Sequence, residues 1–184
     1  MLRTGGIDLA PPGASIGLDA YRSSMTAAGV PFEEIMRRWP QGRLRDDVTA
    51  LYQEQSGIAM ASRANATHRR VAARNGATLL ENTPVESVRE VGGQVEVVAD
   101  GWTYRAGTLV IAAGAWTNRA LAGLGVQFPL EVTLEQVVYL TPRHVAAFAP
   151  ERFPIWIWMD EPSFYGFPIL GEPAVKVAWD RCSV

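Results

Sequence analysis

Residues 108–117, Thr-Leu-Val-Ile-Ala-Ala-Gly-Ala-Trp-Thr, constrain the fold of this chain more than any other stretch. Five apolar residues at 109–113 form a run whose length is typical of a strand that is buried on both faces. Gly114 ends the run, and the residues that follow favour a helix. The sequence therefore predicts a strand, a tight turn and a helix in direct succession.

The predicted turn at Gly114 has two interpretations. A glycine lacks the Cβ atom that keeps a ligand away from the backbone, and the first turn of a helix presents unpaired N–H groups to an anion. One interpretation is therefore a backbone surface that lies against a phosphate-bearing cofactor. The other is an ordinary tight turn of an α/β protein. The pattern alone leaves both open.

Composition and charge exclude several classes of protein. With 184 residues, of which 48% are hydrophobic and 20% charged, the chain can bury a sizeable core. A formal net charge of -2 and a pI near 5.7 give no basic field for nucleic acid. The apolar runs are far shorter than the ~18 residues that a membrane helix needs, and no signal pattern opens the chain, so a cytoplasmic location is expected.

Two common site signatures are missing from the sequence. Cys182 is the single cysteine, which permits neither an internal disulfide nor a cysteine-based zinc site, and no metal site is expected. The G-x-G-x-x-G fingerprint that opens a dinucleotide-binding fold occurs nowhere in the chain. Residues 3–8 are too polar and flexible for a buried first β-strand, so no strand of that kind is expected in residues 1–12.

The first half of the chain combines expected helices with expected strands. Helices are predicted for residues 15–28, 31–38 and 62–76, the first with Ser15 as its N-cap. Strands are predicted for residues 48–52 and 77–81. Residues 84–91 and 94–99 alternate in period two around Gly92-Gly93, which predicts a β-hairpin. A third strand at 102–105 would complete a small meander.

From residue 129 the pattern changes to strands. They are expected at residues 132–140, 155–159, 164–168 and 174–179, consistent with an antiparallel sheet. Aromatic side chains gather in this sheet, namely Trp156, Trp158, Phe164, Tyr165, Phe167 and Trp179. They indicate either an ordinary core or the wall of a pocket for a flat cofactor and an apolar amine.

Lys176 interrupts the apolar strand predicted at residues 174–179. Alternation places it on one face with Ala174 and Ala178. A lysine at such a position points either to solvent, which is the commoner outcome, or into a buried site where its pKa falls and its charge has a function. The pattern alone favours solvent.

Several motifs occur in a characteristic order: Trp39-Pro40, Gly57, Asn75-Gly76-Ala77, Ala113-Gly114-Ala115-Trp116, Pro129-Leu130, Gln136-Val137-Val138 and Tyr165-Gly166-Phe167-Pro168. Their order and approximate spacing resemble those of the D-amino-acid oxidase-like FAD oxidoreductases. The most similar branch includes monomeric sarcosine oxidase and N-methyltryptophan oxidase. The resemblance covers nearly the whole chain.

This resemblance implies an α+β or α/β fold, with an antiparallel-sheet substrate domain and part of an FAD-binding nucleotide domain that carries the β-meander. Residues 1–75 would form the helical and strand part of the substrate domain. Residues 76–128 would form the partial FAD-binding segment, and residues 129–184 the antiparallel sheet. In the family pattern the glycine-rich fingerprint lies upstream of this chain, and the closing flavin-binding segment lies downstream.

The resemblance also implies cofactor contacts. Gly114, with Ala113, Ala115 and Trp116, corresponds to the second flavin-contacting motif of the family. The backbone near Val85 corresponds to a segment beside the adenine of FAD. A position for Val85 in the core is compatible with that contact, because backbone atoms make it.

Two further residues receive roles from the resemblance. Lys176 aligns with the lysine that lies near the flavin N5 in sarcosine oxidase-like enzymes and assists oxygen reduction through its positive charge. A fixed cation in a dry site stabilises the anion that forms when O2 accepts an electron. Tyr165 matches the family's active-site tyrosine, and its spacing from Lys176 is that of the family. A structural tyrosine at the rim of the sheet is the alternative.

The sequence departs from the family pattern at two places. Asp180 stands where the sarcosine oxidase pattern has a histidine, so the role of that histidine does not transfer. Leu134 precedes Glu135-Gln136 where related chains place an arginine. The cysteine that attaches the flavin in some members lies beyond the end of this chain, so Cys182 is not assigned that role.

The resemblance implies an FAD-dependent amine or amino-acid oxidase, in which a C–N bond is oxidised to an imine and O2 is reduced to peroxide. Its partners would be a small-molecule amine or amino acid, with no nucleic acid and no membrane. Two alternatives stay open. The missing fingerprint favours a fragment or subunit that needs the missing N- and C-terminal segments or a partner subunit to bind FAD. An FAD dehydrogenase of the same fold that uses another electron acceptor shares every motif.

Overall fold

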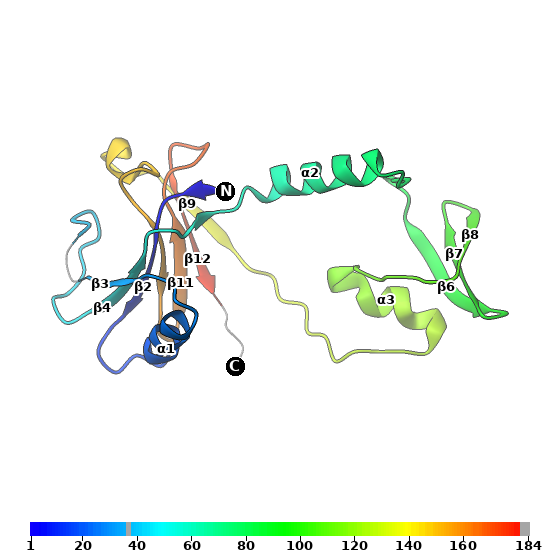
Figure 1. Ribbon diagram of the computed structural model, residues 1–184, viewed down its shortest axis with the longest axis horizontal. Helices are drawn as coiled ribbons and strands as arrows, with labels where there is room; N and C mark the ends of the chain where they lie inside the picture. Colours follow the sequence, from blue (N-terminus) through cyan, green and yellow to red (C-terminus); the bar gives the residue numbers. More distant parts are fainter. Residues whose placement is uncertain (36–37, 181–184) are drawn as a thin grey trace. The chain divides into compact units, whose positions relative to one another are not determined.

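The chain folds into two compact units (Figure 1). This computed structural model describes residues 1–35 and 38–180. Unit 1 combines Met1–Asn65 with Glu135–Val184, and unit 2 is Ala66–Leu134. Unit 1 is therefore assembled from two segments of sequence that unit 2 separates.

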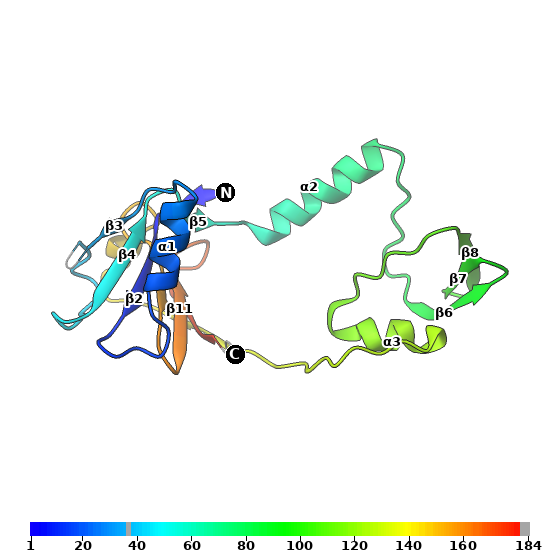
Figure 2. The ribbon, with the colours of Figure 1, turned by 60° about the horizontal axis from the view of Figure 1, so that its bottom comes forward.

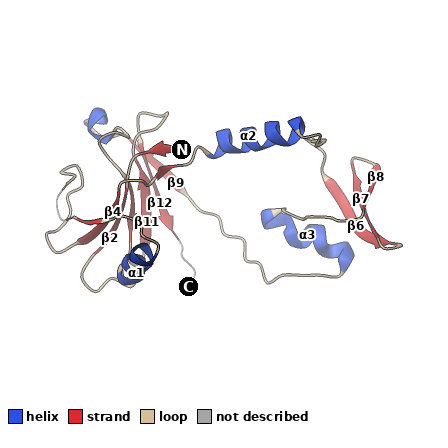
Figure 3. Cartoon of the chain, viewed as in Figure 1, coloured by secondary structure: helices blue, strands red, loops and turns tan. Residues whose placement is uncertain are grey.

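A seven-stranded sheet forms the body of unit 1 (Figure 3). Its strands are β2 (Gly6–Ala10), β3 (Glu33–Glu34), β4 (Thr49–Gln53), β9 (Val137–Leu140), β10 (Ile155–Trp158), β11 (Ser163–Phe167) and β12 (Val175–Asp180). Their order across the sheet is β3-β4-β2-β10-β11-β12-β9. Every neighbouring pair is antiparallel except β2 and β10, which are parallel.

Three smaller elements complete unit 1. Strand β1 (Leu2–Arg3) pairs with β5 (Gly57–Ile58) in a separate two-stranded ladder. Helix α1 (Asp19–Ala27) lies between β2 and β3 in the sequence, and a 3₁₀ turn at Val145–Phe148 precedes β10.

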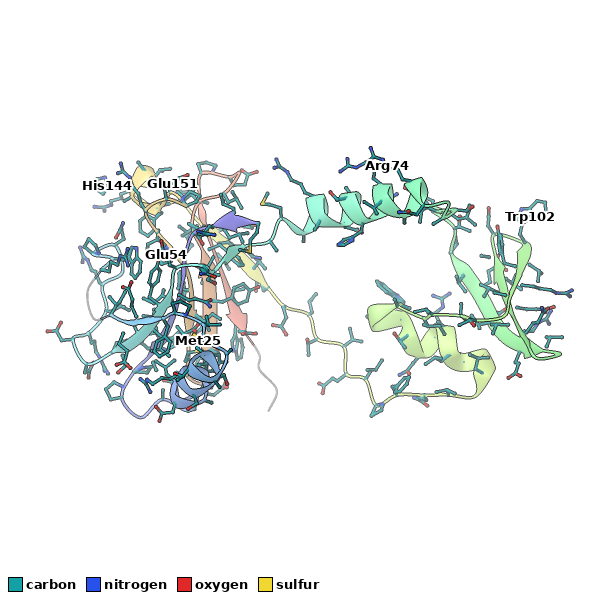
Figure 4. All side chains as sticks on the ribbon, in the orientation of Figure 1. Met25, Glu54, Arg74, Trp102, His144 and Glu151 are labelled. Atoms are coloured by element: carbon teal, nitrogen blue, oxygen red, sulfur yellow. The ribbon has the colours of Figure 1, made fainter. Side chains whose placement is uncertain are left out.

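The sheet of unit 1 has two faces, which we name after Trp156 and Tyr165, because successive side chains of a strand point to opposite sides. The buried cluster on the Trp156 face consists of Ile7, Leu9, Val48, Ala50 and Tyr52. The buried cluster on the Tyr165 face consists of Ala10, Leu18, Leu51 and Met159, and Met25 of α1 packs against it (Figure 2 and Figure 4). Helix α1 therefore packs on the Tyr165 face beside Leu51 of β4 and Ala10 of β2.

The expectation that residues 1–12 contain no buried first β-strand is wrong. Strand β2 lies inside the sheet, and it buries Ile7 and Leu9 on the Trp156 face while Asp8 points to the Tyr165 face. Glycine at position 5 is required by packing: a Cβ there would lie under 3.0 Å from the Tyr52 ring. The polar appearance of this stretch thus reflects close approach and alternation rather than a loop.

The helices predicted for residues 15–28 and 31–38 also need correction. The first spans only Asp19–Ala27, because Ser15 does not cap it: the Ser15 N–H and hydroxyl both donate to Asp160 Oδ1, at 3.1 and 3.2 Å. In the second segment, Glu33–Glu34 form the edge strand β3 against β4. Residues 36 and 37 lie outside the described part of the chain.

Unit 2 is built around a three-stranded meander of β6 (Val85–Val91), β7 (Gln94–Ala99) and β8 (Trp102–Ala106). Gly92 and Gly93, with φ of 60° and 76°, join β6 to β7, and this confirms the predicted hairpin. Helix α2 (Ala61–Arg74) precedes the meander, and α3 (Thr117–Leu121) follows it between the 3₁₀ turns Gly114–Trp116 and Ala122–Leu124.

Two strands expected in unit 2 do not form. Residues 77–81 and 109–113 have no strand assignment, and Val110 is 84% exposed. A strand needs a hydrogen-bonded neighbour, and no described strand pairs with either segment. The prediction of strands at these two segments is therefore wrong, because the described residues supply no neighbouring strand for either.

Glu96 is the buried charged residue at the centre of the meander. Its side chain is 3% exposed, and it accepts hydrogen bonds from Arg105 Nε at 2.8 Å and from Arg89 Nε at 2.8 Å on the two flanking strands. The hydrogen bonds from Arg105 and Arg89 hold the pKa of Glu96 below its ordinary value of 4.5. The carboxylate therefore links all three strands of the meander.

Glu96→Gln should weaken the meander, because an amide removes the charge that both arginines face. We expect faster hydrogen exchange at the β7 amides than in the unsubstituted chain. A depressed pKa stabilises the fold above the ordinary carboxyl pKa and loses that effect as the pH falls through the lower value, so the difference should shrink in acid. Glu90→Gln, on the exposed side of β6, is the control and should exchange normally. Equal protection in both variants would contradict the role of Glu96.

Gly166→Ala should disturb the Trp156 face. Gly166 lies directly across from Trp156, and a Cβ at residue 166 would lie under 3.0 Å from the indole ring. We expect a loss of about 1–3 kcal/mol in the free energy of unfolding, with a change in tryptophan fluorescence. Gly17→Ala, where no atom lies within 4 Å of the added Cβ, is the matched control. A wild-type thermal midpoint for Gly166→Ala would contradict this packing.

Candidate functional site

Lys176 and Tyr165 lie next to each other on the Tyr165 face. In the β11–β12 ladder, Phe167 is opposite Lys176 and Tyr165 is opposite Ala178. The Lys176 Nζ lies 4.8 Å from the ring centroid of Phe167 and 5.5 Å from that of Tyr165. The two rings meet edge to face, with centroids 5.8 Å apart. The pair predicted from the sequence is therefore brought together.

The environment of Lys176 matches neither simple alternative. The side chain is half-buried, and its charge lies over aromatic rings. Among the residues 1–35 and 38–180, no carboxylate forms an ion pair with it. Cation–π attraction holds the ammonium group without neutralising its charge. A positive charge held in this way is available to an anion at the surface of the face.

Asp8 is a residue on this face that the sequence prediction missed. It occupies the same cross-strand row as Tyr165, with Ile157 between them. Burial raises the pKa of its carboxyl group above the ordinary value of 3.8. The available signal was an acidic residue between Ile7 and Leu9, which is unusual in a strand buried on both faces.

The aromatic residues of the sheet divide between the two faces. Tyr165 and Phe167 belong to the Tyr165 face, whereas Trp156, Trp158 and Phe164 line a cavity of about 870 Å³ on the opposite face. Residues 38–46 and 148–154 supply the other walls of this cavity. The proposed single aromatic wall is thus two separate surfaces.

The cavity on the Trp156 face is mainly apolar, with polar groups at residues 38–46. Gln41 Nε2 donates to the carbonyl oxygen of Ala147 at 2.8 Å, while its Oε1 is buried without a partner among the described residues. The Arg38 guanidinium lies 5.3 Å from the Trp39 ring centroid and 4.8 Å from that of Tyr52. The cavity on the Trp156 face is thus an apolar hollow with polar groups along one wall.

The residues predicted to contact FAD belong to unit 2. Gly114 has a φ angle of 52° and begins the 3₁₀ turn. No atom lies within 4 Å of the position that a Cβ would take there. Ala113 and Ala115 flank it, and Trp116 is 68% exposed. An open backbone with an adjacent flat ring fits one wall of a site for a planar ligand, which is the chemistry expected for this segment.

Val85 lies at the start of β6, where the ladder to β7 has a bulge between Val85 and Ser87. Its side chain is exposed, so it is not a core residue of the described unit. The helical segment after Gly114 packs on β6, since a Cβ at Gly123 would lie within 3.3 Å of the Val88 carbonyl group. Val85 and Gly114 therefore belong to elements of one unit.

The helix after Gly114 is shorter than expected. Helix α3 has five residues, and the Trp116 N–H already donates to the Ala113 carbonyl oxygen at 3.0 Å. Fewer free N–H groups are therefore presented there than a full helix start would offer. The contact that this segment can make rests on the open backbone at Gly114.

Asp180, which replaces the family's histidine, ends β12 opposite Ser163 on the Tyr165 face. Cys182 lies outside the described residues. In the part of the chain that the structure describes, no group of three His, Cys, Asp or Glu side chains could hold a metal ion. None of the described helices has the length and hydropathy to cross a membrane.

Comparison with known proteins gives consistent matches. Residues 2–175 match the family described as FAD dependent oxidoreductase, DAO. A monomeric sarcosine oxidase of Streptomyces avermitilis is 36% identical over 192 residues, which cover 98% of this chain and 49% of that protein. An N-methyl-L-tryptophan oxidase of Salmonella heidelberg is 26% identical over 68% of this chain and 35% of that protein. The chain thus spans about half the length of the first of these relatives, and less of the second.

Solved structures confirm the mixed α and β fold. NikD, described as an unusual amino acid oxidase, superposes with a TM-score of 0.74 at 23% identity, over 97% of this chain and 49% of that chain. Glycine oxidase from Geobacillus kaustophilus superposes with a TM-score of 0.67 at 22% identity, over 98% of this chain and 48% of that chain. At identities this low, the superpositions show similarity of fold alone. Because the family profile matches nearly the whole chain, the resemblance predicted from sequence is confirmed, and the chain belongs to the DAO family of FAD-dependent oxidoreductases.

Proposed function

We propose that this chain supplies the substrate-facing sheet and one FAD-contacting segment of an oxidase that acts on an amine or an amino acid. The observation that carries the proposal is the arrangement of Lys176 over the rings of Tyr165 and Phe167 on one open face of the sheet. The relatives named as sarcosine oxidase and N-methyl-L-tryptophan oxidase support the substrate class.

When bound, FAD accepts the electrons of the substrate C–H bond next to nitrogen and passes them to O2. In this proposal, Tyr165 lines the substrate site and its ring fixes the position of Lys176. Lys176 provides a positive charge for the anion that forms as O2 is reduced. Backbone atoms at Val85 and at Ala113, Gly114, Ala115 and Trp116 lie against the nucleotide.

We also propose a division of roles along the chain. Residues 1–75 and 129–184 form the substrate part, and residues 76–128 form the cofactor-contacting part. The first boundary follows directly after α2 (Ala61–Arg74), and the second lies in the loop before β9. A small-molecule substrate is the proposed partner, and a cytoplasmic location stays a prediction.

FAD titration of the purified chain tests the proposal first. Stoichiometric binding, measured by flavin fluorescence, followed by peroxide formation with N-methyl amino acids, is the expected result for a self-sufficient oxidase. Binding only after a second polypeptide is added would favour the subunit alternative. A folded chain that binds no FAD under either condition would contradict the assignment of residues 76–128.

Lys176→Met should slow reoxidation of the reduced flavin by O2 by on the order of 100-fold, because it removes one preorganised charge from the site. Flavin reduction by substrate, followed anaerobically in a stopped-flow instrument, should change much less. Lys176→Arg keeps the charge and should retain most of the oxidation rate. Equal slowing of both half-reactions by Lys176→Met would argue against the assigned role.

A further inference from the structure

Asp8 is an acidic side chain in the interior of the sheet of unit 1. It is the middle residue of β2, which pairs with β4 on one side and with β10 on the other. Its neighbours across the ladder are Leu51 and Ile157, and both are apolar. Strands in this position normally carry apolar residues on both faces, so the sequence departs here from what packing alone favours.

Asp8 has no hydrogen-bond or ion-pair partner among the residues that the structure describes. The cluster under α1, which includes Leu51 and Met159, borders it and removes water from one side. That burial raises the pKa of the carboxyl group. A half-buried carboxylate without a partner destabilises the fold, because the charge loses hydration and gains nothing in return.

The other charged groups near this face are already engaged or lie elsewhere on it. On α1 and β3, Arg22 forms ion pairs with Asp19 and with Glu34. Asp160, after β10, accepts hydrogen bonds from Ser15, and these lower its pKa. On β12, Lys176 lies over the Phe167 and Tyr165 rings, and Asp180 ends the strand. The described groups therefore leave Asp8 without a cation.

Asp8 and Tyr165 belong to one row of side chains. The row runs from Asp8 through Ile157 to Tyr165, one residue on each of three neighbouring strands. Strands lie about 4.8 Å apart, so the two Cα atoms are roughly 10 Å apart. Both side chains extend from the same face, and Ile157 lies between them in the row.

We propose that Asp8 binds the cationic nitrogen of a small substrate that lies on the Tyr165 face. The inference rests on the proposed function, and it adds to that function a residue that selects the charge of the substrate. A cation supplies the partner that the carboxylate lacks, and the attraction between opposite charges is stronger away from bulk water than at an exposed surface. Asp8 is thus a binding residue whose contribution depends on its charge.

The test compares two probes of the same shape. Glycine betaine carries a quaternary nitrogen, and 3,3-dimethylbutanoate has carbon at that position. Binding of each probe to the native protein is measured by calorimetry, which does not depend on catalytic turnover. We expect betaine to bind more tightly than 3,3-dimethylbutanoate. Asp8→Asn should weaken betaine binding by about tenfold or more, whereas binding of 3,3-dimethylbutanoate, an anion that lacks the cationic group, should not weaken. Glu54→Gln removes the same charge from an exposed turn and should leave both affinities unchanged.

A thermal unfolding measurement distinguishes binding from a structural role. A carboxyl whose folded pKa is raised above 3.8 opposes folding as the pH rises past that value, so Asp8→Asn should unfold at the same temperature as the unsubstituted chain or higher at pH 7. A large drop would show that Asp8 supports the fold and would overturn the inference. An equal loss of affinity for both probes in Asp8→Asn would also overturn the inference, as would a native protein that binds betaine no more tightly than 3,3-dimethylbutanoate.

These outcomes separate the inference from the proposed function. If the native protein oxidises amines and Asp8→Asn leaves the betaine preference intact, the inference fails alone. If the preference depends on Asp8 but no amine is oxidised, the cation site stands and the proposed oxidase activity fails.

Discussion

The parallel pairing of β2 with β10 is the interaction on which the rest of unit 1 depends. It joins Gly6–Ala10 to Ile155–Trp158, two segments that lie on opposite sides of unit 2 in the sequence. Without this ladder, the sheet would divide into two parts. One part would hold β3, β4 and β2, and the other would hold β10, β11, β12 and β9. The ladder also aligns Asp8, Ile157 and Tyr165 across the sheet, so the same pairing that closes the core positions the candidate site.

Local rules predicted the parts of the fold that depend on neighbouring residues. The Gly92-Gly93 turn predicts its hairpin because two successive positive φ angles require glycine, and the structure has both. Strands were expected at residues 164–168 and 174–179, and their antiparallel pairing as β11 and β12 brings Tyr165 and Lys176 together. Both features are hairpin-like, and their registers follow from the chain between them.

The features that sequence reasoning missed depend on distant partners. Strand β2 follows Gly5 and contains Gly6 and Asp8, and only the packing of Tyr52 and the pairing with β10 explain why such a stretch is buried. Residues 109–113 show the opposite case. Their composition predicts a buried strand, yet a strand forms only where another strand offers hydrogen bonds, and the described residues offer none. Pattern identifies what a segment can form, and tertiary partners decide whether it forms.

The charges of Lys176 and Asp8 on the Tyr165 face are not neutralised by ion pairs among the described residues. If Lys176 formed an ion pair with a carboxylate, its field would be cancelled a few ångströms away. Aromatic rings attract an ammonium group through their quadrupole and leave its net charge unchanged, so Lys176 over Phe167 and Tyr165 still projects a positive potential. Asp8, bordered by apolar side chains on the same face, likewise keeps its negative charge available when ionised. A sheet face selected for stability alone would bring such charges together or replace them with apolar residues. The proposed binding of a charged substrate depends on this separation of the two charges.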